Sequence, residues 1–126
     1  MLTNDERRVR ERLETWELRI QRILAVYSKD GTLSSSGRQL VRSLYGDLKV
    51  SLRAAFKAGD SWEGRSQMND AERRFYHPAI EAASAHLVAR PESSPEAWHH
   101  SLCDALSQIS DAVILLDERE NRARTG

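Results

Sequence analysis

The C-terminal third of the sequence carries an apolar pattern that strongly constrains the fold. Starting at Trp98, apolar residues follow at intervals of four, three, four, three and four positions. They are Trp98, Leu102, Ala105, Ile109, Ala112 and Leu116. These intervals place all six side chains on one face of an α-helix. The sequence therefore predicts a helix over residues 95–120. Ser94 is a suitable cap for this helix, and Pro95 suits its first position.

Two more helices are predicted in the N-terminal half. Thr3 and Glu6 have the spacing of a capping box, and two interleaved seven-residue series of apolar residues follow them. The series are Leu2, Val9, Trp16 and Ile23, and Leu13, Ile20 and Tyr27. They predict one long helix over residues 4–29. A second helix is predicted over residues 35–58, and its inward-facing residues are Val41, Leu44, Tyr45, Leu48, Leu52 and Ala55.

A third helix is predicted over residues 70–90, opened by Asn69 and Glu72 at capping-box spacing. Its inward face contains Phe75 or Tyr76, followed by Ala79, Ile80, Ala83 and Leu87. We expect the segment before it, residues 59–69, to be a surface connection because it has two glycines and no periodicity. Trp62 in this segment is expected to fold back onto the core.

Pro78 interrupts the third predicted helix. It has no amide hydrogen to donate to the carbonyl of Arg74, and its ring disfavours helical geometry at His77. The helix must therefore bend at this point or restart with Pro78 as its first residue. Such a bend either wraps the helix around the core or forms a pocket in which Tyr76 and His77 contact a ligand. The sequence leaves both interpretations open.

Four helices joined by short connections favour antiparallel neighbours. We therefore predict an all-α fold, an antiparallel four-helix bundle with a proline-kinked third helix, in a single domain over residues 1–126. Residues 120–126 are expected to fray. The proportion of hydrophobic residues, 40%, is too high for a disordered chain and matches a globular protein.

Charge and cysteine content limit the classes of function. Nineteen basic and nineteen acidic residues cancel, so no global field attracts the chain to nucleic acid or to an anionic membrane. The single cysteine, Cys103, cannot form an internal disulfide, which favours a reducing compartment. The charged N-terminus lacks the apolar run of a signal peptide, and no stretch approaches a membrane span. We expect a cytoplasmic protein without a membrane association.

Residue patterns for metal binding and catalysis are incomplete. Helical-bundle metal sites use two Glu-x-x-His pairs, but the only such spacing here joins Glu96 and His99. Glu96, His100 and Asp104 share a helix face, and that face points away from the apolar one. Cys103 has histidines nearby in sequence but no orienting group or strained elbow. We therefore expect no catalytic residues, no metal and no cofactor, and an enzyme or metalloprotein is the third alternative.

Basic residues gather on one side of the second predicted helix. They lie within an arc of about 100° and extend over roughly 28 Å at the helical rise per residue. These residues, called the basic stripe below, are Arg38, Arg42, Lys49, Arg53 and Lys57. A row of cations at this spacing is able to follow the phosphates of DNA or RNA. It lacks interleaved aromatic residues and any recognition-helix motif, which weakens that interpretation.

The fourth predicted helix has the opposite charge. Before Arg119 it has five acidic residues and no basic one, and these are Glu96, Asp104, Asp111, Asp117 and Glu118. The two charged helices are able to attract each other within one bundle, between two copies or toward a charged partner, or they are simply solvated faces. Ile114 lies near the outer, acidic side, and an exposed branched residue in a charged field is typical of an interface.

These observations predict a non-catalytic protein-interaction module that is able to self-associate. The candidate partner-binding residues are Ile114, Asp111, Asp104, Tyr76 and His77. The alternative is a nucleic-acid-associated protein that uses the basic stripe.

Overall fold

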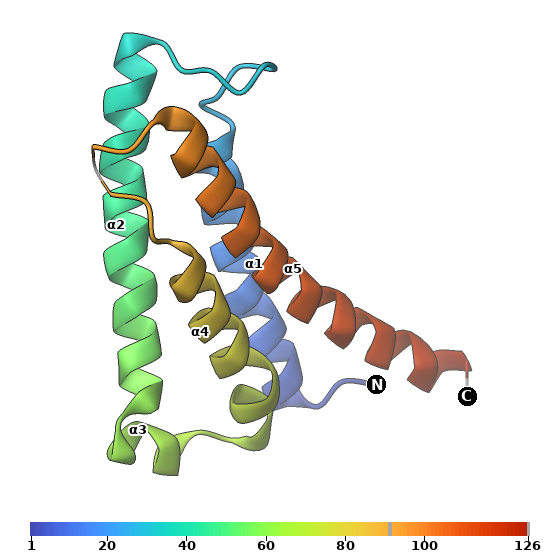
Figure 1. The fold of residues 1–126 in the computed structure, drawn as a ribbon. Helices are drawn as coiled ribbons and strands as arrows, with labels where there is room; N and C mark the ends of the chain where they lie inside the picture. The colour runs from blue at the N-terminus through green and yellow to red at the C-terminus, as the bar shows by residue number, and fades with distance from the viewer. Residues whose placement is uncertain (91, 126) are drawn as a thin grey trace.

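The computed structural model describes residues 1–90 and 92–125, with side chains up to residue 122, and all regular structure in them is helical (Figure 1). The predicted all-α class is confirmed. The helices are α1 (Asn4–Leu24), α2 (Ser35–Asp60), α3 (Trp62–Gln67), the π-helical turn η1 (Glu72–Tyr76), α4 (His77–His86) and α5 (Pro95–Thr125). The described residues thus contain five α-helices and one π-helical turn, where the sequence predicted four helices.

Side-chain caps set the starts of the long helices. The Thr3 hydroxyl accepts a hydrogen bond from the Glu6 N–H at 3.1 Å, and the Glu6 carboxylate accepts one from the Thr3 N–H at 3.2 Å. This capping box satisfies two backbone donors that the first turn of a helix leaves free. Ser34 caps α2, and the Ser94 hydroxyl accepts from the Ala97 N–H at 3.2 Å at the start of α5. The caps predicted at Thr3 and Ser94 are therefore confirmed.

The helix ends differ more from the sequence prediction. α1 ends at Leu24, five residues earlier than expected, and a turn with Gly31 at φ 79° follows it. Asp30 stabilises this turn by accepting hydrogen bonds from the Ser28 hydroxyl and from Thr32. α5 continues to Thr125 where a frayed tail was expected.

The third predicted helix also ends early, because a long-range contact ends it. The Ala89 N–H donates to the hydroxyl of Tyr45 on α2 at 3.2 Å, so it is not available to a helical carbonyl. α4 accordingly ends at His86 and not at residue 90. Tyr45 thereby ties the segment after α4 to the middle of α2.

Neighbouring helices alternate in direction, as long-range contacts show. Tyr27, just after α1, donates its hydroxyl to the carbonyl of Pro95 at the start of α5. Arg10 in α1 bonds Asp117 near the end of α5, so α1 and α5 run antiparallel. α2 and α5 lie on opposite sides of α4 in Figure 1, and α4 packs against both.

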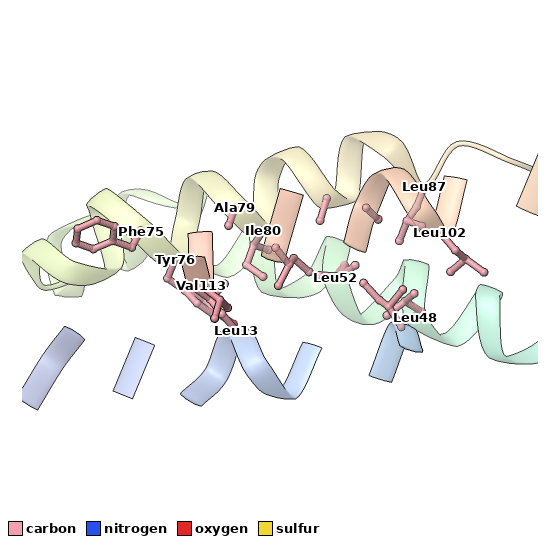
Figure 2. Close-up of a cluster of buried hydrophobic side chains, with 14 of the residues drawn as sticks. Leu13, Leu48, Leu52, Phe75, Tyr76, Ala79, Ile80, Leu87, Leu102 and Val113 are labelled. Atoms are coloured by element: carbon pink, nitrogen blue, oxygen red, sulfur yellow. The ribbon is translucent and has the colours of Figure 1, made fainter. Parts of the chain in front are cut away.

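One apolar core joins the helices. Figure 2 shows side chains of η1 and α4 pointing toward Leu48 and Leu52 of α2 and Leu13 of α1. The largest side chains with less than 2% exposure are Val9, Leu13, Ile20, Val41, Leu48, Leu52, Ile80, Leu87, Trp98, Leu102, Ile109 and Leu116. Each of these residues belongs to an apolar series found in the sequence, so the helical spacing of apolar residues correctly predicted these core positions.

The chain accommodates Pro78 with a widened turn. The His77 N–H bonds the carbonyl of Glu72, five residues back, and α4 then starts with Pro78 in its first turn, where no amide hydrogen is needed. Phe75 and Tyr76 are both buried, at 5% and 8% exposure, although the sequence predicted that only one of them faces inward. The π-helical turn holds more residues per turn than an α-helix, which is how two consecutive aromatic side chains reach the core.

The segment between α2 and η1 contradicts two expectations. Residues 62–67 form α3, and Trp62 is 87% exposed instead of folding back onto the core. The Ser61 hydroxyl accepts from the Gly64 N–H at 2.9 Å and so caps this short helix. A Cβ atom at Gly64 would overlap the carbonyl of Ala58, so the absence of a side chain lets α3 pack closely against the end of α2.

Candidate interaction surfaces

The basic stripe runs along α2, with Lys49, Arg53 and Lys57 beside α4 and with Arg38 and Arg42 near Glu92, beyond the end of α4. Four of its cations are exposed and Lys49 is partly buried. None of the five forms an ion pair with the residues that the structure describes. Arg38 is the one held by a ring contact, with its guanidinium carbon 5.8 Å from the centre of the Trp98 ring. These cations therefore do not hold the fold together through ion pairs with described residues, and most of them face solvent.

A groove of about 550 Å³ runs between α2 and α4, next to three cations of the stripe. We call it the α2–α4 groove, and its lining residues are Lys49, Arg53, Phe56, Lys57, Glu81, Ser84, Ala85, Leu87 and Val88. It combines three positive charges and one carboxylate with an apolar lining. Val88 is 68% exposed at its edge. The groove therefore offers both a positive field and apolar surface to a ligand.

The outward-facing side of α5 carries a compact helical pattern. Asp111, Ile114, Leu115 and Glu118 follow one another at i, i+3, i+4 and i+7, which places them side by side on one face. We call these four residues the α5 outer face. Ile114 is 52% exposed and Leu115 is 45% exposed, while both carboxylates are exposed. An apolar pair thus lies in solvent between the carboxylates of Asp111 and Glu118, and the Arg122 guanidinium lies 3.6 Å from that of Glu118.

Asp104 lies two turns before Asp111, but partners within the chain engage its carboxylate. His100 approaches it at 3.2 Å and His86 of α4 at 4.0 Å. Asp117 is likewise engaged, because the Arg10 guanidinium donates to it at 2.6 Å and the pKa of Arg10 is raised as a result. Asp104 and Asp117 therefore face residues of other helices, unlike Asp111 and Glu118 of the α5 outer face.

Tyr76 and His77 lie away from the α5 outer face. The buried Tyr76 accepts a hydrogen bond from the indole N–H of Trp16 at 3.1 Å, and the Arg12 guanidinium lies 3.8 Å from the centre of its ring. His77 stacks on Phe56 of α2 with ring centres 5.3 Å apart. Both residues also border a small cleft of about 260 Å³ beneath α3. Their main contacts hold η1 and α4 against α1 and α2.

A surface cavity of about 600 Å³ lies where the first turn of α1 meets η1, the residues just before it and Arg119 of α5. Glu6 lines it and accepts from Arg119 at 2.9 Å. Burial raises the pKa of Glu6, but hydrogen bonds from the Thr3 backbone and from Arg119 outweigh it, so the pKa is lowered. The carboxylate is thus ionised and already matched by a cation, as in a structural ion pair.

Among the described residues, no three or more His, Cys, Asp and Glu side chains gather closely enough to hold a metal ion. The Sγ atom of Cys103 lies 3.8 Å from the His99 ring nitrogen Nδ1. Burial raises the pKa of the Cys103 thiol and the nearby Asp104 adds to this, which disfavours the reactive thiolate.

Sequence reasoning found the cations of the basic stripe but missed the apolar lining beside them. Phe56 belongs to α2 and Val88 to the segment after α4, and only the packing of α4 on α2 brings them to one groove. Ile114 was identified from its place among acidic residues, and Leu115 completes the apolar pair.

Comparisons with family models, curated proteins and solved structures found no match for this chain. In the part of the chain that the structure describes, no helix has both the length and the apolar content needed to cross a membrane.

Proposed function

We propose that this chain is a non-catalytic, cytoplasmic protein-interaction module, in which α1, α2, α4 and α5 form an antiparallel bundle that presents the α5 outer face to a partner. The observation that carries the proposal is the exposed pair Ile114 and Leu115 between two carboxylates. The single cysteine supports a reducing compartment.

The way α5 is held supports recognition by this face. Its opposite side is fixed in the core by Trp98, Leu102 and Ile109, all less than 2% exposed. A partner therefore meets a helix that is already ordered, and binding costs little conformational entropy. The i, i+3, i+4, i+7 arrangement is the one by which grooves recognise amphipathic helices, with apolar side chains for affinity and charges for orientation.

Replacing Ile114 by Asp tests the proposal. We expect Ile114→Asp to lose partner capture or assembly while the domain stays folded, because a half-exposed side chain contributes little to the core. Binding is measured by pull-down or sedimentation, and folding by circular dichroism. Leu40→Asp is the matched control, since Leu40 is 49% exposed on α2 outside this face. Unchanged assembly and unchanged capture by Ile114→Asp would contradict the proposal.

The basic stripe supports nucleic-acid binding as a second candidate function. The favouring observation is that its cations are not engaged in ion pairs with described residues along a 26-residue helix. Contacts from such a row to phosphates release counterions, so binding would weaken steeply as salt rises.

A salt titration with labelled single- and double-stranded oligonucleotides tests this second candidate. If it is right, Arg42→Glu with Arg53→Glu abolishes binding and removes its salt dependence. Arg8→Glu with Arg22→Glu makes the same change in net charge at exposed positions of α1 and is expected to bind more strongly than the α2 variant. No binding by the wild type at low salt, or equal losses in both variants, would rule out the stripe as a nucleic-acid site.

A further inference from the structure

The α5 outer face and the α2–α4 groove are complementary in chemistry. The face has two apolar side chains flanked by Asp111 and Glu118. The groove has an apolar lining and three cations, with Glu81 as its one carboxylate. Apolar surface would therefore meet apolar surface while carboxylates meet cations, which is the arrangement that gives an interface its orientation and specificity.

The spacing of the charges also agrees. Asp111 and Glu118 are seven residues apart, which is about 10 Å along a helix. Lys49 and Lys57 are eight residues apart on α2, or about 12 Å, with Arg53 midway. A helix lying along α2 is therefore able to bring one carboxylate near each end of the cationic row at the same time.

The two surfaces of one molecule cannot meet each other. The start of α5 lies close to α2, but the C-terminal part of α5, which carries the outer face, runs away from α2 (Figure 1), and none of the ion pairs seen among the described residues joins the two helices. Complementary surfaces on opposite sides of a molecule join one copy to the next, head to tail.

From these three observations we infer that the α5 outer face docks in the α2–α4 groove of a second copy of this chain. The inference rests on the proposed function and identifies the partner. Each copy has one face and one groove, so association continues beyond the dimer, into rings or open chains. Because charge pairs contribute to the contact, association weakens as salt rises.

A charge-exchange experiment tests the inference. The face-reversed variant carries Asp111→Lys and Glu118→Lys, and the groove-reversed variant carries Arg53→Glu and Lys57→Glu. In each variant alone, face and groove have the same sign and repel, so both variants are expected to stay monomeric. When they are mixed, each face meets a groove of opposite sign, and association is expected to return.

Sedimentation velocity over a concentration series is the readout, with circular dichroism to show that every variant is folded. The wild type and the mixture should rise above the monomer mass of 14.4 kDa as concentration increases, and more strongly at low salt. A wild type that stays monomeric up to about 1 mM would overturn the inference. So would association that both variants retain, or a mixture that stays monomeric.

The outcomes also separate this inference from the proposed function. If the wild type is monomeric but captures a different protein through Ile114, self-docking is wrong and the interaction module stands. If the wild type is monomeric and Ile114→Asp changes no capture, both are wrong. If the charge exchange restores association, both are supported.

Discussion

Trp98→Ala is expected to lower the free energy of unfolding by about 3–5 kcal/mol, the cost usual for removing a fully buried large aromatic side chain. Trp98 is 1% exposed in the first turns of α5. Its indole N–H donates to the carbonyl of Arg90 at 3.0 Å, so the substitution opens a cavity and also removes this bond. Small domains are stable by only about 5–15 kcal/mol, so much of this margin would be lost.

Urea unfolding, followed by circular dichroism, measures this loss. Trp62→Ala is the matched control because it removes the same side chain from a position that is 87% exposed. We expect that control to change the stability by less than about 0.5 kcal/mol. Equal effects of the two substitutions would contradict the described packing of α5 and the exposure of Trp62.

The second large effect is a loss of stability in alkali that depends on Tyr27. Burial raises the pKa of Tyr27 to about 12, and the nearby Cys103 and Glu96 add to this. The ordinary tyrosine value in the unfolded chain is about 10. Folding thus favours the neutral phenol, whose hydroxyl donates to the Pro95 carbonyl at 3.2 Å. Its contribution is complete below about pH 10 and is lost as the pH rises toward 12.

A pKa shift of this size would correspond to a contribution of about 2.7 kcal/mol to the free energy of unfolding. Because Tyr27 is only partly buried, we expect a contribution of about 1–2 kcal/mol. Urea unfolding between about pH 9 and pH 12 measures it, as the difference between the wild type and Tyr27→Phe. The variant lacks the titrating hydroxyl, so its stability should fall less steeply over this range. Parallel curves for the two proteins would show that Tyr27 titrates normally in the folded chain.

The sequence predicted the long helices because their burial is periodic. Each cap at Thr3, Ser34 and Ser94 is a local signal that acts over three residues, and the apolar series repeat over several turns. α3 was missed because it is only six residues long and its position depends on Gly64 fitting against α2. An aromatic side chain usually favours burial, and that preference gave the wrong prediction for Trp62.

The candidate surfaces were predicted only in part, for a physical reason. The position of a residue on its own helix follows from helical geometry, so the basic stripe and Ile114 could be located. Whether a side chain is engaged by another helix depends on the tertiary packing. Tyr76 accepts a hydrogen bond from Trp16, and Asp104 lies near His86. Neither pairing can be recognised from the local sequence.

Zero-length cross-linking with a carbodiimide reports directly whether the α5 outer face of one copy meets the α2–α4 groove of another. It joins carboxylates to lysine amines in contact, and the chain has three lysines, Lys29, Lys49 and Lys57. A mixture of isotopically light and heavy protein separates links between copies from links within one. We expect light–heavy links from the Asp111–Glu118 segment to Lys49 or Lys57. Light–heavy links only at Lys29, or none at all, would contradict the docking.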